Sequence, residues 1–150
     1  MGSTFQLFEK AERLEMACAE IYRALARQFQ DQPRARDLLQ RLGAEEEQHA
    51  ARVRLLSVRY QHDSRLLEAA AVAAHHLDEL LAEAHAVLSQ IASGAWSGSF
   101  EVVKGELADL EARFSAAHAH VIASAANPAL RAFFEQLAGQ DKAHVELLRS

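Results

Sequence analysis

Glu46-Glu47-Gln48-His49 is a Glu-x-x-His sequence whose first and last residues, three positions apart, fall on one face of a helix. The same spacing returns 95 positions later in Asp141-Lys142-Ala143-His144. The correspondence extends outwards at this offset, pairing Pro33 with Pro128, Arg36 with Arg131, Leu42 with Leu137 and Val53 with Leu148. The sequence therefore predicts one two-helix unit that is used twice.

The composition favours an all-α chain. Of the 150 residues 50% are apolar, proline occurs only twice, and alternating strand patterns are essentially absent. This length is sufficient for one folded domain that needs neither a disulfide nor a structural metal. We expect a single domain over residues 1–150, with a helical hairpin at about 4–61, a crossover helix at about 64–93 and a second hairpin at about 99–149. Together they would form a four-helix bundle with a long helical crossover between its second and third helices.

Charge and cysteine content exclude several classes of partner and cofactor. The net charge is −5 and no basic stripe is visible, which argues against nucleic acid as a partner. Cys18 is the single cysteine, so neither a disulfide framework nor a Cys-x-x-Cys iron–sulfur centre can form within the chain. No secretory signal is visible at the start, and the longest apolar run, residues 69–74, is too short to span a membrane. We expect a cytoplasmic protein without a membrane partner.

Each of the four expected bundle helices has an apolar seam that is interrupted by acidic or histidine residues. In the first helix, expected from Ser3 to about Phe29, the interruption is Glu15, and a carboxylate at an inward position is costly unless something compensates its charge. An antiparallel hairpin sets Glu15 and Glu46 level, because each lies about 20 Å from the turn between the two helices. The interrupting residues of all four seams are Glu15, Glu46, His49, Glu111, Asp141 and His144.

This set matches the ligands of dinuclear metal sites in helical bundles, which take one carboxylate from each of two helices and a carboxylate-x-x-His from each of the other two. Hard divalent ions favour carboxylate oxygens, and imidazole adds a neutral nitrogen. Four carboxylates carry a charge of −4, which two divalent cations would neutralise in the core. The sequence thus predicts that all six residues bind metal at one level of the bundle. The alternative is a polar core that shares protons and holds no metal.

Tyr22 and His118 are the candidate catalytic residues outside the ligand set. Each follows the single carboxylate of its helix by seven positions, from which a hydrogen bond could orient the metal ligands. Ordinary packing in the seam is the alternative for Tyr22. Cys18 lies one helical turn from Glu15 and is expected to be a small core residue.

These helices resemble the rubrerythrin-like branch of the ferritin-like superfamily. The matching stretches are residues 15–22, 42–50, 111–118 and 137–144, which lie on all four bundle helices. The resemblance implies a ferritin-like four-helix bundle with a non-haem di-iron site that reacts with oxygen or peroxide. It implies two iron ions (Fe2+/Fe3+), with manganese or zinc as substitutes, and a homodimer. The ligands that it implies are Glu15, Glu46, His49, Glu111, Asp141 and His144.

The sequence departs from the family pattern at three positions. Asp141 replaces the usual glutamate and is one methylene shorter, Phe114 replaces an additional carboxylate, and His118 replaces the usual tyrosine. No rubredoxin-type Cys-x-x-Cys pair is present, so the family reaction would need an external electron donor. Two functions follow as hypotheses. One is an oxidoreductase that reduces peroxide or oxygen or oxidises ferrous iron, and the other is a non-catalytic ferritin-like module that binds metal or a partner.

Overall fold

The computed structural model of the chain describes residues 2–60, 67–124 and 128–150 and, within them, all side chains except those of residues 2–5, 60, 67–74, 117–124 and 130. The described residues form helices and contain no strand. This confirms the prediction of an all-α chain. The helices are α1 (Gly2–Gln28), α2 (Pro33–Tyr60), α3 (Leu67–Ala92), α4 (Phe100–Ser124) and α5 (Pro128–Arg149).

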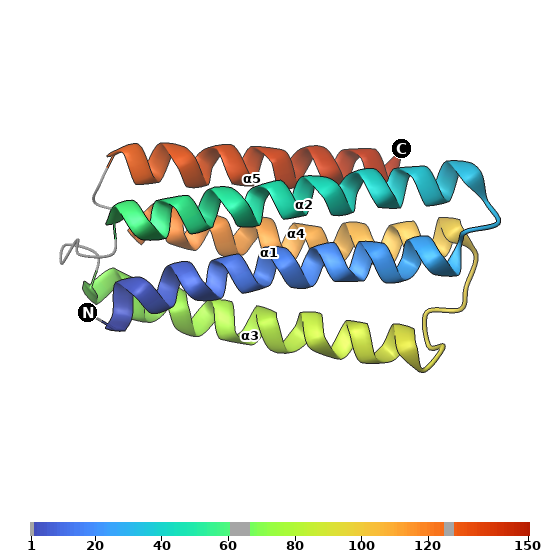
Figure 1. Cartoon of the computed structure of the whole chain (residues 1–150), viewed down its shortest axis with the longest axis horizontal. Coiled ribbons are helices and arrows are strands. Elements are labelled where there is room, and N and C mark those ends of the chain that lie inside the picture. The colour runs from blue at the N-terminus through green and yellow to red at the C-terminus, as the bar shows by residue number, and fades with distance from the viewer. Residues whose placement is uncertain (1, 61–66, 125–127) are drawn as a thin grey trace.

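The helices lie side by side along the long axis of the molecule (Figure 1). α1 and α2 pack as one antiparallel pair, and α4 and α5 pack as another. α3 packs against α1 and also contacts α4. It runs back along the length of the molecule, so that α2 and α4 point in the same direction (Figure 1). In each hairpin one helix, α1 or α4, contacts α3, and the other helix, α2 or α5, lies on the side away from α3.

The two prolines stand at the starts of α2 and α5. Pro33 is the first residue of α2 and Pro128 is the first residue of α5. Proline suits this position because its fixed φ fits a helix and its missing N–H would have no partner in the first turn. The repeat thus places the Glu-x-x-His of α2 and the Asp-x-x-His of α5 at the same distance from the start of each helix.

The connection between α3 and α4 is built around Gly94 and Trp96. Gly94 has a φ of 84° and ends α3, with its N–H donating to the carbonyl of Ile91 at 3.1 Å. The indole Nε1 of Trp96 donates to Gln90 Oε1 at 2.9 Å, and the Trp96 side chain is buried. At the start of α4, Ser99 Oγ accepts the N–H of Val102 at 3.4 Å. These contacts fix the loop that the sequence predicts at residues 93–99.

The apolar seams form the core on both sides of the acidic residues. Burial of each leucine or phenylalanine side chain contributes about 1.5–3 kcal/mol. Gly43 lies on α2 where it faces α1, and a Cβ built on it would meet Tyr22 Cβ at 3.4 Å. This close approach sets α2 against α1 one turn before Glu46. Fully buried core side chains are Phe8, Leu14, Leu25, Leu39, Leu42, Leu107, Phe134 and Leu137.

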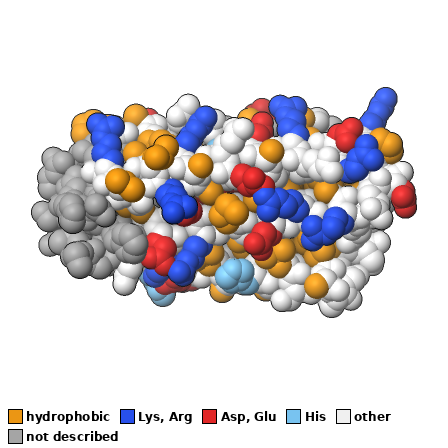
Figure 2. Space-filling model, in the orientation of Figure 1, with side chains coloured by type: hydrophobic (Ala, Val, Ile, Leu, Met, Phe, Trp, Pro, Cys, Tyr) orange, Lys and Arg blue, Asp and Glu red, His pale blue; other side chains and the backbone are white. Residues whose placement is uncertain are grey.

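Figure 2 shows Lys and Arg side chains interspersed with Asp and Glu on the viewed face, without a continuous area of one charge. Several charged side chains of the described residues are paired, such as Lys10 Nζ with Asp78 Oδ2 at 2.7 Å and Arg149 Nη2 with Asp109 Oδ1 at 3.1 Å. Exposed pairs of this kind contribute little to stability. Among the described residues, no helix has both the length and the apolar character that a membrane span requires.

Candidate metal centre

The structure brings the side chains of all six predicted ligands together in the space between the helices. Each lies well inside its helix and is buried, with at most 4% of the residue's surface exposed. They are the buried polar or charged residues of the part of the chain that the structure describes. Four helices contribute, namely α1 with Glu15, α2 with Glu46 and His49, α4 with Glu111, and α5 with Asp141 and His144.

The six residues form two overlapping groups of donor atoms. In each group the donor atoms lie within 4.8 Å of one another, a spacing that allows them to bind one ion. Glu46 belongs to both groups, so its carboxylate lies between the two candidate metal positions. The first group is Glu46, Glu111, Asp141 and His144, and the second is Glu15, Glu46 and His49.

Both histidines turn Nδ1 towards the carboxylates. Nδ1 of His144 lies 3.1 Å from Glu46 Oε1 and 3.4 Å from Glu111 Oε1. Nδ1 of His49 lies 3.5 Å from Glu46 Oε2 and 3.6 Å from Glu15 Oε2. The two rings are stacked, with centroids 5.9 Å apart and an interplanar angle of 13°. Each oxygen of Glu46 therefore faces one histidine.

Several of these buried atoms have no hydrogen-bond partner of normal geometry among the described residues. They include both oxygens of Glu46, Nδ1 of His49 and Oε2 of Glu111. Each buried polar atom left in this state costs about 1–3 kcal/mol, and more when it is charged. A divalent cation at each position would satisfy them together, because carboxylate oxygens and imidazole nitrogens are its preferred ligands. The residues thus fit a dinuclear metal centre.

Burial and the neighbouring carboxylates shift the pKa values of two residues in the centre. Burial, followed by the charges of Glu111 and Glu15, raises the pKa of Glu46 well above its ordinary value. Burial lowers the pKa of His144, but hydrogen bonds and charges from Glu111 and Glu45 raise it more, to about 9. These shifts favour protons on Glu46 and His144, and such protons must leave when metal binds.

Of the two candidate catalytic residues, only Tyr22 has a described side chain. It is buried, and its hydroxyl donates a short hydrogen bond to Glu111 Oε1. Burial and the nearby charge of Glu111 raise the pKa of Tyr22, so it remains a donor at neutral pH. His118 belongs to α4, and its side chain lies outside the described residues. Cys18 is buried in the core, as expected, and its burial raises the pKa of the thiol.

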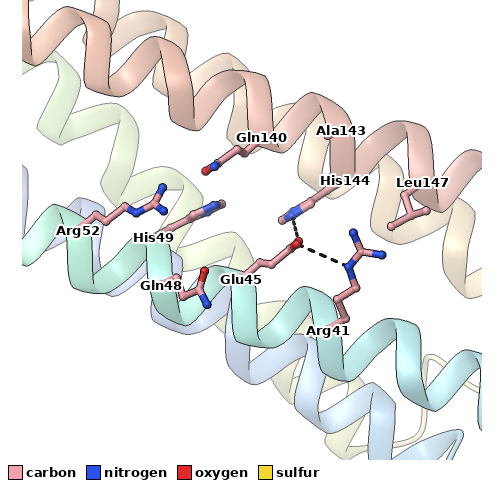
Figure 3. Close-up of a pocket in the computed structure, with 9 residues that line it drawn as sticks. All are labelled: Arg41, Glu45, Gln48, His49, Arg52, Gln140, Ala143, His144 and Leu147. Atoms are coloured by element: carbon pink, nitrogen blue, oxygen red, sulfur yellow. Dashed lines mark hydrogen bonds and ion pairs between the residues drawn. The ribbon is translucent and has the colours of Figure 1, made fainter.

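Glu45 is a site residue that the sequence reasoning missed. Its Oε2 lies 2.7 Å from Nε2 of His144, on the side of the ring away from the carboxylates. Its Oε1 lies 3.6 Å from Nε of Arg41, one turn earlier on α2 (Figure 3). The residue is half-buried and stands outside the apolar seam, so its position in the helix gave no sign of a role. The one sign of a role in the sequence is the repeat, which pairs Glu45 with another long polar residue, Gln140.

A cavity of about 280 Å³ opens onto the two histidines between α2 and α5 (Figure 3). Its volume suits a small molecule, and most of the side chains that line it are polar. Both histidines therefore connect the buried carboxylates with a space that reaches the surface. Besides His49 and His144, the polar residues that line it are Arg41, Glu45, Gln48, Arg52 and Gln140.

Comparisons with models of protein families, with curated proteins and with solved structures find no match for this chain. The function has to be argued from the buried residues, their geometry and the cavity beside them.

Proposed function

We propose that the chain is a ferritin-like four-helix bundle, with α3 as its helical crossover, and that it is a non-haem di-iron oxidoreductase of the rubrerythrin-like type. Its substrate would be peroxide or oxygen, which it reduces, or ferrous iron, which it oxidises. The observation that carries this proposal is the pair of donor groups that share the carboxylate of Glu46. The position of α3, which connects two antiparallel hairpins in the sequence and packs against α1 and α4, supports the fold assignment.

Asp141 is part of the proposed centre although its side chain is short. Its carboxylate lies within 4.8 Å of donor atoms from Glu46, Glu111 and His144, and only 1% of its surface is exposed. The missing methylene therefore does not separate α5 from the centre. The donor set of oxygen and nitrogen atoms suits iron, and manganese or zinc would compete for it.

A bound ferrous pair would supply two electrons, which with two protons reduce one hydrogen peroxide to two waters. The protein contributes ligands, orientation and exclusion of water. Tyr22 donates to Oε1 of Glu111 and so leaves Oε2 of that carboxylate for a metal. Buried leucines one turn before the ligands, such as Leu42 before Glu46 and Leu107 before Glu111, keep bulk water away. An external donor would return the electrons after each turnover.

The cavity between α2 and α5 supports a small substrate. It touches His49 and His144 and has a volume of about 280 Å³, enough for a peroxide with several waters. Substrate in this cavity would lie beside the imidazoles and reach the metals past them. The cavity therefore favours dioxygen, a peroxide or a hydrated ion over a macromolecular substrate.

The proposal is tested by elemental analysis after anaerobic loading with ferrous iron. The expected content is about two irons per chain, falling to one or fewer in Asp141→Ala. Peroxide turnover with an artificial reductant should then disappear in Glu46→Ala and persist in Glu47→Ala, whose glutamate pairs with Arg23 outside the centre. A native chain that holds no iron, or an iron-loaded chain without turnover by any of the three substrates, would contradict the oxidoreductase function.

A second candidate is a ferritin-like module that binds metal without catalysis. It is favoured by Phe114, which is 3% exposed and stands where the family pattern has an additional carboxylate. Two tightly bound metals without turnover would support this candidate, because the ligands would then serve structure or storage.

A further inference from the structure

The 95-residue repeat pairs two residues that line the cavity. The offset that relates Glu46 to Asp141 and His49 to His144 also relates Glu45 to Gln140. Glu45 lies on α2 and Gln140 on α5, and both border the cavity beside the histidines (Figure 3). One copy of the repeat thus has a carboxylate where the other has a neutral amide of nearly the same shape.

Glu45 holds the ring of His144 from its outer side. Its Oε2 lies 2.7 Å from Nε2, while Nδ1 of the same ring faces Glu46 and Glu111. A carboxylate at Nε2 accepts the N–H there and leaves the lone pair of Nδ1 for a metal. A histidine ligand paired with a carboxylate in this way is also more basic, and it binds metal more strongly.

Gln140 has the corresponding position relative to His49. Figure 3 shows the two side chains entering the cavity from opposite helices. Nδ1 of His49 faces Glu15 and Glu46, so its Nε2 is on the other edge of the ring. Oε1 of Gln140 is buried and has no hydrogen-bond partner among the described residues. By the repeat, this oxygen corresponds to Oε2 of Glu45, and the Nε2 edge of His49 corresponds to that of His144.

We propose that Glu45 and Gln140 are positioning residues for His144 and His49, and that their different charges make the two metal positions unequal, with tighter binding at His144. This inference rests on the proposed metal function. A charged acceptor strengthens the ligand more than a neutral amide does, since hydrogen bonds to ionised groups are roughly twice as strong as neutral ones. The repeat therefore supplies one histidine ligand to each metal position, and the residues beside Nε2, Glu45 and Gln140, make the two histidines different.

The test uses zinc, titrated into the metal-free full-length chain against a chromophoric chelator. Glu45→Gln should weaken binding of the first zinc by about 10–100-fold, the usual effect of losing a partner of a metal-bound histidine. Gln140→Glu should instead tighten binding of the second zinc by about 10-fold, and thus bring the two affinities together. Glu47→Gln removes the same charge from α2, and the exposed Gln48→Glu adds one in the cavity, so they control for charge alone.

The 1H shifts of the histidine ring N–H groups, recorded on the 15N-labelled zinc-loaded protein, provide a second readout that packing alone would not move. The Nε2 proton of His144 should resonate downfield in the native chain and move upfield in Glu45→Gln, and that of His49 should move downfield in Gln140→Glu. If Glu45→Gln and Gln140→Glu have the same zinc affinities and the same N–H shifts as their control variants, the inference is overturned while the metal function stands. A native chain that binds no zinc overturns both. If Glu45→Gln does not fold, Gln140→Glu still decides.

Discussion

Oε1 of Glu46 on α2 lies 3.1 Å from Nδ1 of His144 on α5, across the boundary between the two hairpins. Oε2 of the same carboxylate faces His49 on its own helix at 3.5 Å. One carboxylate thus joins the two repeats at the level of the centre. Its loss should have consequences that the loss of any ligand belonging to a single group does not.

Glu46→Ala should lose both metal ions, whereas Glu15→Ala should lose one. Glu46 contributes to both groups of donor atoms, and Glu15 contributes only to the group with His49. Zinc content after loading and desalting, measured by elemental analysis, distinguishes the two variants. Equal losses in both would show that Glu46 does not lie between the metals.

Glu46→Gln should stabilise the metal-free protein while it weakens metal binding. Burial and the charges of Glu111 and Glu15 already disfavour the ionised form of Glu46, as its raised pKa shows. A neutral amide of the same shape removes this repulsion, and replacement of unfavourable buried charges commonly adds about 1–4 kcal/mol. Urea unfolding at pH 8 in the presence of a chelator measures the change. A lower midpoint than that of the native chain would refute the prediction.

The metal-free protein should become less stable as the pH rises from 6.5 to 9. The pKa of His144 is about 9 in the folded chain against an ordinary value of 6.5, so the folded state holds this proton more tightly than the unfolded state does. The raised pKa of Glu46 acts in the same direction. The slope due to one proton is at most about 1.4 kcal/mol per pH unit.

Urea unfolding at several pH values, with chelator present, measures this slope. His144→Asn should flatten it between pH 6.5 and 9, because the titrating group is gone. Zinc should show the opposite trend and bind more tightly at the higher pH, since bound metal displaces the same protons. Stability that rises with pH in the metal-free chain would contradict the assignment of the proton to His144.

Tyr22→Phe should weaken zinc binding by about 10-fold and leave the fold intact. The phenyl ring keeps the buried packing of Tyr22, but Glu111 loses the hydrogen bond that orients it. Trp96→Phe is the control, because it removes a hydrogen bond to Gln90 in the α3–α4 loop, away from the centre. Affinities measured by chelator competition should differ between the two variants, and equal affinities would reduce Tyr22 to a packing residue.

The six buried residues could be predicted from the sequence because each interrupts an apolar seam. A polar residue at an inward position is unusual, and the carboxylate-x-x-His sequences at Glu46 and Asp141, which the repeat matches, both indicate a place in the core. The starts of α2 and α5 could also be predicted, because proline is tolerated in the first turn of a helix and disrupts its interior, which fits Pro33 and Pro128.

The role of Glu45 and the inequality of the two groups could not be predicted in this way. Glu45, Glu46 and Glu47 are consecutive acids, and the rotation of α2 against α5 decides which of them reaches His144. The repeat also suggests two equal halves, whereas Asp141 joins only the group that contains His144. Both features depend on how the hairpins pack, and seam periodicity carries no information about that.

The centre lies near the middle of its helices, and this separates the parts of the chain that must stay constant from those that can change. Thirteen residues of helix, about 20 Å, lie between Glu15 and the end of α1. Fraying at that end, or a change in the exposed connection at residues 30–32, is too distant to move a ligand. That connection should accept an inserted domain without loss of metal, which makes it a suitable place to graft an electron-transfer partner onto this scaffold.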